Sequence, residues 1–137
     1  MNEIPAGFAG NIVRDFELRF TGNGQAVVSL TVAVTPRRWD AQQWRDGATS
    51  YIDVTAWGQL AEHAAELRQG HRVLVQGRWA TRLYTPQSGP NAGTEVRRLE
   101  VVADELGPSL RWALARPEKA PGKPNLRPVP PETEPPL

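Results

Sequence analysis

The spacing of apolar side chains changes from the period of a strand to the period of a helix at one place in this chain. Residues 26–34 and 51–57 alternate between apolar and polar side chains, which is typical of strands with one buried face. Residues 59–69 instead carry one apolar stripe at spacings of four and three, and Gly70 follows, which predicts a short helix. Alternation returns over 71–84. The chain is therefore predicted to consist of strands, with one helix near its middle.

Two further segments complete the predicted order of elements. A strand interrupted near Arg14 covers residues 8–20, and a last strand covers residues 95–103. A type I′ turn at Asn23 and Gly24 links the first strand to the second. Five short strands need closure to hide their edges, and a helix between the third and fourth strands can cover one end. We therefore predict an all-β fold, a five-stranded OB (oligonucleotide/oligosaccharide-binding) barrel with one short helix.

Proline and glycine divide the rest of the chain into loops and a tail. Residues 36–50 are predicted to form a long polar loop, and residues 85–94 a hairpin loop. Residues 1–115 are thus predicted to form one OB-fold domain, in which residues 107–114 are apolar enough to pack as an added strand or hook. Residues 116–137 are predicted to be a disordered or polyproline-like tail, because proline is frequent there and apolar groups are few.

Composition narrows the cellular setting. The chain contains no cysteine, which excludes disulfides and thiolate chemistry and fits a reducing cytoplasm. Residues 1–16 hold no apolar run long enough for a signal peptide, and no segment approaches the length of a membrane span. We therefore expect a cytoplasmic protein without a membrane partner.

Net charge gives little guidance, so the positions of the arginines matter more. Residues 1–107 contain eleven arginines and no lysine, against twelve carboxylates. A phosphate-binding protein usually shows a basic excess, and this segment has none. The use of arginine alone favours planar stacking and forked phosphate contacts. A high-GC codon bias explains the absence of lysine equally well.

Four aromatic side chains are expected at exposed positions. Tyr51 and Trp57 share the polar face of the strand 51–57, because the alternate positions are apolar. Tyr84 is expected on the outer face of the following strand, and Trp39 at the mouth of the long loop. Rings that a core does not need are a platform for stacking flat groups, most economically the bases of a single-stranded nucleic acid.

Arginines accompany these rings and are expected to contact phosphates. Trp79 is expected in the core, whereas the arginines of the same strand share the outer face with Tyr84. The predicted binding site consists of Trp39, Tyr51, Trp57, Tyr84, Arg37, Arg38, Arg72, Arg78 and Arg82.

Each ring also has a plainer interpretation. Trp57 is compatible with a place in the core, and Tyr51 and Tyr84 with ordinary cross-strand pairs. Trp39 and Trp44 are compatible with a packed cluster in the loop. Other arginines, such as those at positions 14, 19, 97 and 98, are expected to be solvated charges when taken singly.

Catalytic and metal-binding patterns are absent from the sequence. His63 is expected on the helix and His71 at the start of a strand, with no spacing suited to a metal. The sequence has no nucleophile elbow, no phosphate-binding P-loop and no obvious carboxylate pair. We therefore expect no enzyme activity, no catalytic residue, no metal and no cofactor.

At this point the sequence resembles the bacterial single-stranded DNA-binding protein family over residues 4 to 115. The resemblance is carried by FAGNIVRDFELRF (8–20), NGQAVVSLTVAV (23–34), YIDVTAWGQLAE (51–62), GxRVxVxGR (70–78) and TRLY (81–84). The ending DELGPSLRWALAR (104–116) is similar to the actinobacterial branch.

The resemblance implies a fold, an assembly and a set of site residues. It implies an OB barrel assembled as a homotetramer around which DNA wraps, with residues 107–114 as an extra strand that clasps subunits. It places the base-stacking aromatics of the family on Trp39, Tyr51, Trp57 and Tyr84. Family members usually close with an acidic peptide and a terminal aromatic that recruits enzymes, whereas residues 132–137 here hold two acids and no aromatic. Replication and repair proteins are therefore uncertain partners, and the chain is interpreted as a secondary paralogue.

The predicted function is sequence-tolerant binding and protection of single-stranded DNA in replication, recombination or repair, at the nucleoid. The alternative is an OB-fold adaptor that uses the same rings to hold a protein of the replication machinery. A nuclease-type or tRNA-binding OB enzyme would need a catalytic group that the sequence does not offer.

Overall fold

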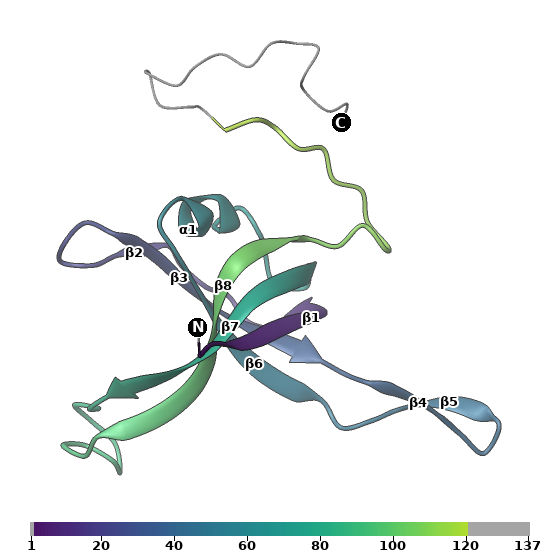
Figure 1. Ribbon diagram of the computed structural model, residues 1–137, viewed down its shortest axis with the longest axis horizontal. Coiled ribbons are helices and arrows are strands. Elements are labelled where there is room, and N and C mark those ends of the chain that lie inside the picture. Colours follow the sequence, from purple (N-terminus) through teal and green to yellow (C-terminus); the bar gives the residue numbers. More distant parts are fainter. Residues whose placement is uncertain (1, 121–137) are drawn as a thin grey trace.

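The computed structural model describes residues 2–120, and it is a β-barrel with one short helix and two projecting hairpin arms (Figure 1). The helix α1 (Gln59–Ala64) lies between the sixth and seventh strands. The strands are β1 (Ile4–Ile12), β2 (Arg19–Phe20), β3 (Ala26–Val34), β4 (Arg37–Asp40), β5 (Gln43–Asp46), β6 (Ser50–Trp57), β7 (Arg72–Tyr84) and β8 (Val96–Pro108).

Five of these strands close into a ring. The order of neighbours is β1-β7-β8-β6-β3, and the end of β1 pairs with β3, so that no strand edge of the ring is left open. β6 and β8 run parallel, at Val54 opposite Val101, and the other pairings are antiparallel. The helix follows the third strand of the ring. The predicted five-stranded OB barrel with a helix between its third and fourth strands is confirmed.

Each strand of the ring contributes at least one fully buried side chain to the core. They include Ile12, Leu30, Val54, Val73 and Val101, all with at most 1% of their surface exposed. Burying an aliphatic side chain of this size contributes roughly 1.5–3 kcal/mol. Ala61 and Ala64 of α1 are buried against one end of the barrel, and Trp79 packs against the core as predicted. The alternation in the sequence therefore corresponds to a single closed core.

Gly77 marks a change of register between β7 and β8. The pairing shifts between Gln76 and Gly77, and a Cβ at Gly77 would collide with the carbonyl oxygen of Val102. Only glycine allows the two backbones to approach so closely at this irregularity. Beyond it, β7 and β8 leave the barrel together as an arm (Figure 1).

The segment 36–50 was predicted to be a loop, and this prediction is wrong. The structure has a second arm there, the antiparallel pair β4 and β5. Its turn places Ala41 and Gln42 at positive φ, 50° and 67°. Neither residue is among those that favour such angles, so the usual turn signal of Asn-Gly or Asp-Gly is missing.

The turn before β3 also differs from the prediction. Gly24 has a φ of 81°, but Asn23 does not have a positive φ, whereas a type I′ turn requires positive values at both central residues. The Gly24 amide donates to the Thr21 carbonyl at 2.8 Å. The connection is therefore a type I turn closed by a left-handed glycine, which is the usual three-residue hairpin.

Several boundaries shift as well. The first strand begins at Ile4 and ends at Ile12, and only the pair Arg19–Phe20 resumes it. The predicted helix is shorter at its C-terminal end, although Leu67 still packs against the core. The last strand runs on to Pro108.

Residues 107–114, predicted to pack as an added strand or hook, do not form an added strand in this chain. Gly107 and Pro108 are the end of β8, and the Ser109 amide donates to the Arg72 carbonyl at 2.9 Å. The side chains that follow, Leu110, Trp112 and Leu114, are exposed.

The residues predicted as a Pro-rich tail lie, from 121 onward, outside the described residues, and so does the segment 132–137. Within residues 2–120 no helix has the length and apolar character needed to cross a bilayer.

Candidate nucleic-acid interface

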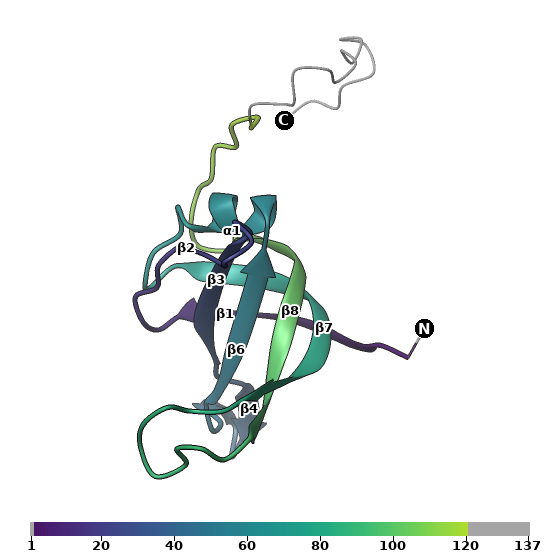
Figure 2. The same cartoon turned by 90° about the vertical axis from the view of Figure 1, so that its left-hand side faces the viewer.

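A groove opens on the wall of the barrel formed by β3, β6 and β8, which lie side by side in Figure 2. It lies between the turn that joins β2 to β3 and the arm of β7 and β8, and has a volume of about 330 Å³. Two rings, two guanidinium groups, three hydroxyl-bearing side chains and a carboxylate line it, from Phe20, Trp57, Arg19, Arg82, Thr21, Ser29, Thr55 and Glu100. This combination of apolar rings and charges is suited to a ligand that is flat and ionic.

Trp57 is the best-fixed ring of the groove. Its neighbour Ala56 is buried, so the alternation of β6 turns the indole outward, where 41% of its surface is exposed. Its backbone pairs with Val27 of β3, and the Gly58 amide donates to the Ala26 carbonyl at 2.9 Å. Gly58 takes a positive φ of 67° as the chain turns into α1. Strand pairing on one side and the helix on the other therefore hold the backbone that carries the ring in place.

Tyr51 lies at the other end of the same strand. It is 67% exposed and pairs with Ala33. The six residue steps from Tyr51 to Trp57 correspond to roughly 20 Å along a strand. Both rings lie on the outer face of β6, as the alternation predicts, and neither is buried in the core.

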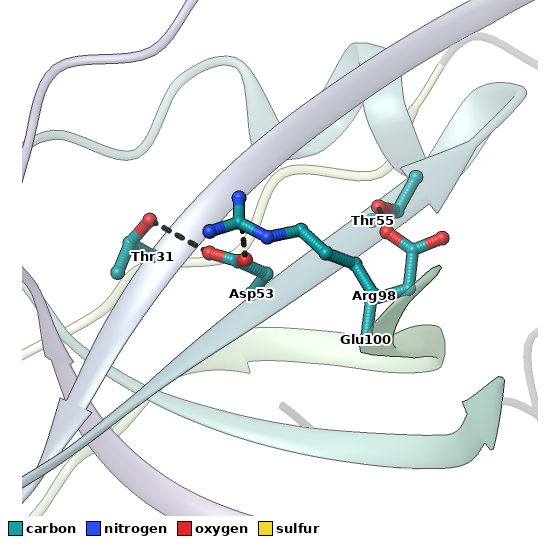
Figure 3. Close-up of polar contacts among 5 residues, drawn as sticks. All are labelled: Thr31, Asp53, Thr55, Arg98 and Glu100. Atoms are coloured by element: carbon teal, nitrogen blue, oxygen red, sulfur yellow. Dashed lines mark hydrogen bonds and ion pairs between the residues drawn. The ribbon is translucent and has the colours of Figure 1, made fainter. Parts of the chain in front are cut away.

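A polar network fills the wall between these two rings (Figure 3). The Thr31 hydroxyl donates to Asp53 Oδ1 at 3.2 Å, and Arg98 Nη1 lies 4.0 Å from Asp53 Oδ2. The Thr55 hydroxyl donates to Glu100 Oε2 at 2.7 Å. These contacts connect β3, β6 and β8 across the outer face, so the floor of the interface is polar and its ends are aromatic.

The arm of β7 and β8 supplies further members of the predicted site. The Arg82 guanidinium lies 5.2 Å from the centroid of the Tyr84 ring, within the range of a cation–π contact. Arg82 also lines the groove and pairs across the arm with Arg98. Arg78, near the base of the arm, forms an ion pair with Asp104 at 3.0 Å.

The arm of β4 and β5 holds Trp39 in a different setting. Trp39 pairs with Trp44, with ring centroids 5.5 Å apart and the planes at 71°. Both indoles are mostly exposed. Arg37 forms an ion pair with Asp46 at 3.3 Å, and Arg38 is exposed. The structure is thus compatible both with a ring cluster and with a contact to a ligand that reaches this arm.

Arg72 is the predicted site residue that the structure separates from the others. It begins β7, whereas Tyr84 ends it, and twelve residues of strand span roughly 40 Å. Its guanidinium lies 4.7 Å from the centroid of the Trp112 ring. The guanidinium of Arg111 lies at the same distance, 4.7 Å, from that centroid. Arg72 therefore holds the chain that follows β8.

Three charged or aromatic groove residues and one residue of the polar network were not among the predicted contacts: Arg19, Phe20 and Glu100, and Arg98. Arg19 and Arg98 were taken to be solvated charges, and the structure places one in the groove and the other in the polar network. Phe20 is 61% exposed next to the turn, and Glu100 reaches Thr55 across forty-five positions of sequence. Only the position of Phe20 directly before a hairpin turn was a signal in the sequence.

Within residues 2–120 no three His, Asp or Glu side chains gather as metal ligands.

The fold and the groove define a class of protein, the OB barrels with a wall of rings and cations. The chain belongs to the single-strand binding protein family, whose model matches residues 6–109. The predicted resemblance to this family, in its actinobacterial branch, is confirmed.

Relatives and a solved structure agree with this assignment. The chain is 43% identical over 110 residues to a single-stranded DNA-binding protein of Paenarthrobacter nicotinovorans, over 78% of this chain and 62% of the relative. It is 44% identical over 114 residues to one of Mycobacterium leprae, over 81% of this chain and 66% of the relative. It thus spans less than two thirds of the length of these relatives.

The crystal structure of a small single-stranded DNA-binding protein from Streptomyces coelicolor superimposes with a TM-score of 0.65 at 33% identity. That match covers 80% of this chain and 97% of the other. It supports the OB fold over the barrel and its arms.

Proposed function

We propose that this chain binds and protects single-stranded DNA with little sequence preference, without catalysing a reaction, at the nucleoid during replication, recombination or repair. The observation that carries the proposal is Trp57, an indole fixed by strand pairing yet open to solvent in a groove that also holds Phe20 and Arg82. The names of the relatives support the same ligand.

The bases would stack and the phosphates would meet arginines. Each base stacked on an aromatic side chain contributes roughly 1–3 kcal/mol, whatever the base. A strand that follows the wall of β6 passes from Trp57 to Tyr51, with Tyr84 on one arm and Trp39 on the other. The phosphates would be met by Arg82 in the groove and, on the arms, by Arg37, Arg38 and Arg78.

The affinity is expected to fall only modestly as salt rises. The barrel segment has no basic excess, and Arg37 and Arg78 already have carboxylate partners. Fewer cations are then released from the DNA per bound protein than with a strongly basic binder.

We also propose that the chain assembles as a homotetramer. An apolar hollow of about 850 Å³ runs along β1, β7 and β8 on a wall away from the groove, and Leu74 is exposed in it. Apolar surface of this kind is typical of a subunit interface. Sedimentation analysis of the full chain tests this assembly.

Titration of tryptophan fluorescence with oligo-dT tests the function. Stacking of bases on Trp57 is expected to quench the emission, whereas an OB adaptor that holds only a protein would give no change. Trp112→Ala is the matched control, because it removes an exposed indole that packs on Arg72 outside the groove. Quenching that persists in Trp57→Ala and vanishes in Trp112→Ala would contradict the proposed site.

A further inference from the structure

We infer that Arg98 is a further contact for a phosphate of the bound strand, and that Asp53 holds it in position on the barrel wall. The inference rests on the proposed binding of single-stranded DNA and adds one residue to that site. In the free protein Arg98 is the ion-pair partner of Asp53. The bound strand would take the place of this partner.

Arg98 lies on the wall between the two rings of β6. Asp53 is two residue steps from Tyr51 and four from Trp57, which correspond to roughly 7 and 13 Å along a strand. Arg98 reaches this point from β8, and its Nη1 lies 4.0 Å from Asp53 Oδ2 (Figure 3). A nucleic-acid strand whose bases stack on both rings has to pass its phosphates near this guanidinium.

The ion pair with Asp53 leaves most of the Arg98 guanidinium available. Within residues 2–120 it is the longest of the four ion pairs, and the Arg98 side chain is 58% exposed. Exposed ion pairs contribute little to stability. A guanidinium has five N–H donors in a fork that matches two oxygens of a phosphate. A phosphate can therefore replace Asp53 as the partner of Arg98 at little cost.

The charges on this wall depend on Arg98. Three guanidinium groups stand on the wall and in its groove, from Arg19, Arg82 and Arg98. Two carboxylates accompany them, from Asp53 and Glu100. Without Arg98 these charges would cancel. Arg98 therefore gives the wall the positive charge that attracts a phosphate.

Arg82 strengthens the attraction from the neighbouring strand. Arg82 and Arg98 are directly opposite each other in the pairing of β7 with β8, so their side chains leave the same face of the arm. Like charges directly opposite each other on paired strands are destabilising. An anion bound beside them relieves this repulsion, which favours a phosphate at this position.

Asp53 has two opposed effects on a bound strand. Its Oδ1 accepts the hydroxyl of Thr31 at 3.2 Å, and Thr31 is only 5% exposed, so the carboxylate is held on the wall with Oδ2 toward Arg98. It thus keeps the guanidinium on the path of the strand. Once a phosphate has taken the guanidinium, the charge of Asp53 repels that phosphate. We therefore expect Arg98 to raise the affinity and Asp53 to lower it, although they are partners in the free protein.

The test measures the affinity of the full chain for oligo-dT of about 12 nucleotides, within the range that one OB barrel occupies. Anisotropy of a labelled oligonucleotide is recorded at several salt concentrations. Arg98→Ala is expected to lower the affinity about fivefold and to reduce the slope of log affinity against log salt by about 0.7. Asp53→Asn keeps an oxygen for Thr31 and removes the charge, so it is expected to raise the affinity about threefold.

The opposite signs distinguish a phosphate contact from a structural ion pair. If the pair only stabilised the wall, Arg98→Ala and Asp53→Asn would both lower the affinity, and this outcome overturns the inference. Arg98→Lys keeps the charge and loses the fork. It is expected to keep the salt slope of the wild-type chain and to lose about half of the affinity.

Arg97→Ala is the matched control on the same strand. Arg97 is exposed and pairs with Leu83, and because neighbouring residues of a strand face opposite ways, it lies on the other face of the arm. We expect Arg97→Ala to leave both the affinity and the salt slope unchanged. Equal losses in Arg97→Ala and Arg98→Ala would show a general effect of charge and overturn the inference.

The outcomes also separate this inference from the function on which it rests. If the wild-type chain does not bind oligo-dT, the proposed function fails. If it binds and Trp57→Ala weakens binding, while Arg98→Ala binds as tightly as the wild-type chain, only the contact assigned to Arg98 fails.

Discussion

The ring on the barrel wall and the rings on the β4–β5 arm are held in opposite ways. Trp57 belongs to a strand with partners on both sides, β3 and β8, and part of its surface is covered. Trp39 and Trp44 lie on an isolated two-stranded arm, 62% and 59% exposed, and pair edge to face with each other. Two-stranded ribbons are only marginally stable on their own. The wall therefore offers a ring in a fixed position, and the arm offers rings that can adjust to the path of a ligand.

The largest effect is expected at the fixed ring. Trp57→Ala should lower the affinity for oligo-dT about 10- to 100-fold, the equivalent of roughly 1–3 kcal/mol for one stacked base. Trp57→Phe should retain most of the affinity, because a smaller ring still stacks. Fluorescence anisotropy of a labelled oligonucleotide measures both. Equal losses in the two variants would indicate a damaged barrel instead of a lost stack.

A smaller loss is expected at Phe20, the second ring of the groove. It belongs to a strand of only two residues at the rim, so its position is less restricted than that of Trp57. Phe20→Ala should weaken binding about fivefold, near the lower limit for a stacked base. Phe20→Leu is the control for apolar area, and affinity equal to wild type in that variant would show that stacking is not the contribution of Phe20.

The arm should respond less than either wall ring. Trp39→Ala is expected to weaken binding about threefold, because the neighbouring Trp44 remains available as a stacking surface. The double variant with Trp44→Ala should lose more than the sum of the two single changes in free energy. A loss in Trp39→Ala as large as in Trp57→Ala would break the distinction between the two regions.

The smallest effect is expected at Arg72, which stacks on Trp112 at the far end of β7. Arg72→Ala should leave both the affinity for oligo-dT and its salt dependence unchanged. Arg82→Ala should reduce the slope of log affinity against log salt by about 0.7, which is the value for one phosphate contact on a single strand. Titrations at several salt concentrations measure the two slopes. A reduced slope in Arg72→Ala would place the DNA path well outside the groove.

The regular part of the fold could be predicted from the sequence because its local signals agree. Larger apolar side chains occupy every second position over most of β3 and β6, so the faces of Val54 and Trp57 follow directly. The β4–β5 arm could not be predicted this way, because an arm exposed on both faces has no apolar alternation. Its turn residues Ala41 and Gln42 carry no turn signal either.

The predicted site shows the same limit at longer range. Alternation tells which face a side chain occupies and not how far along the strand it lies, so Arg72 was grouped with Tyr84 although β7 separates them. The contact of Glu100 with Thr55 depends on the register of β8 against β6, which pair over only two positions. No local pattern in the sequence specifies that register.

The closed order of strands has a consequence for how the chain is made. β1 leaves the ribosome first, yet its partner is the much later β7, with Gly7 opposite Gln76. β6 and β7 both also pair with β8, which is made last. The ring cannot be completed before Pro108 has emerged. Until then, the nascent β3–β6 hairpin exposes Leu30 and Val54 to solvent, and pairing between such distant segments is slow. We expect translation of this protein to pass through a stage at which chaperones shield the unfinished sheet.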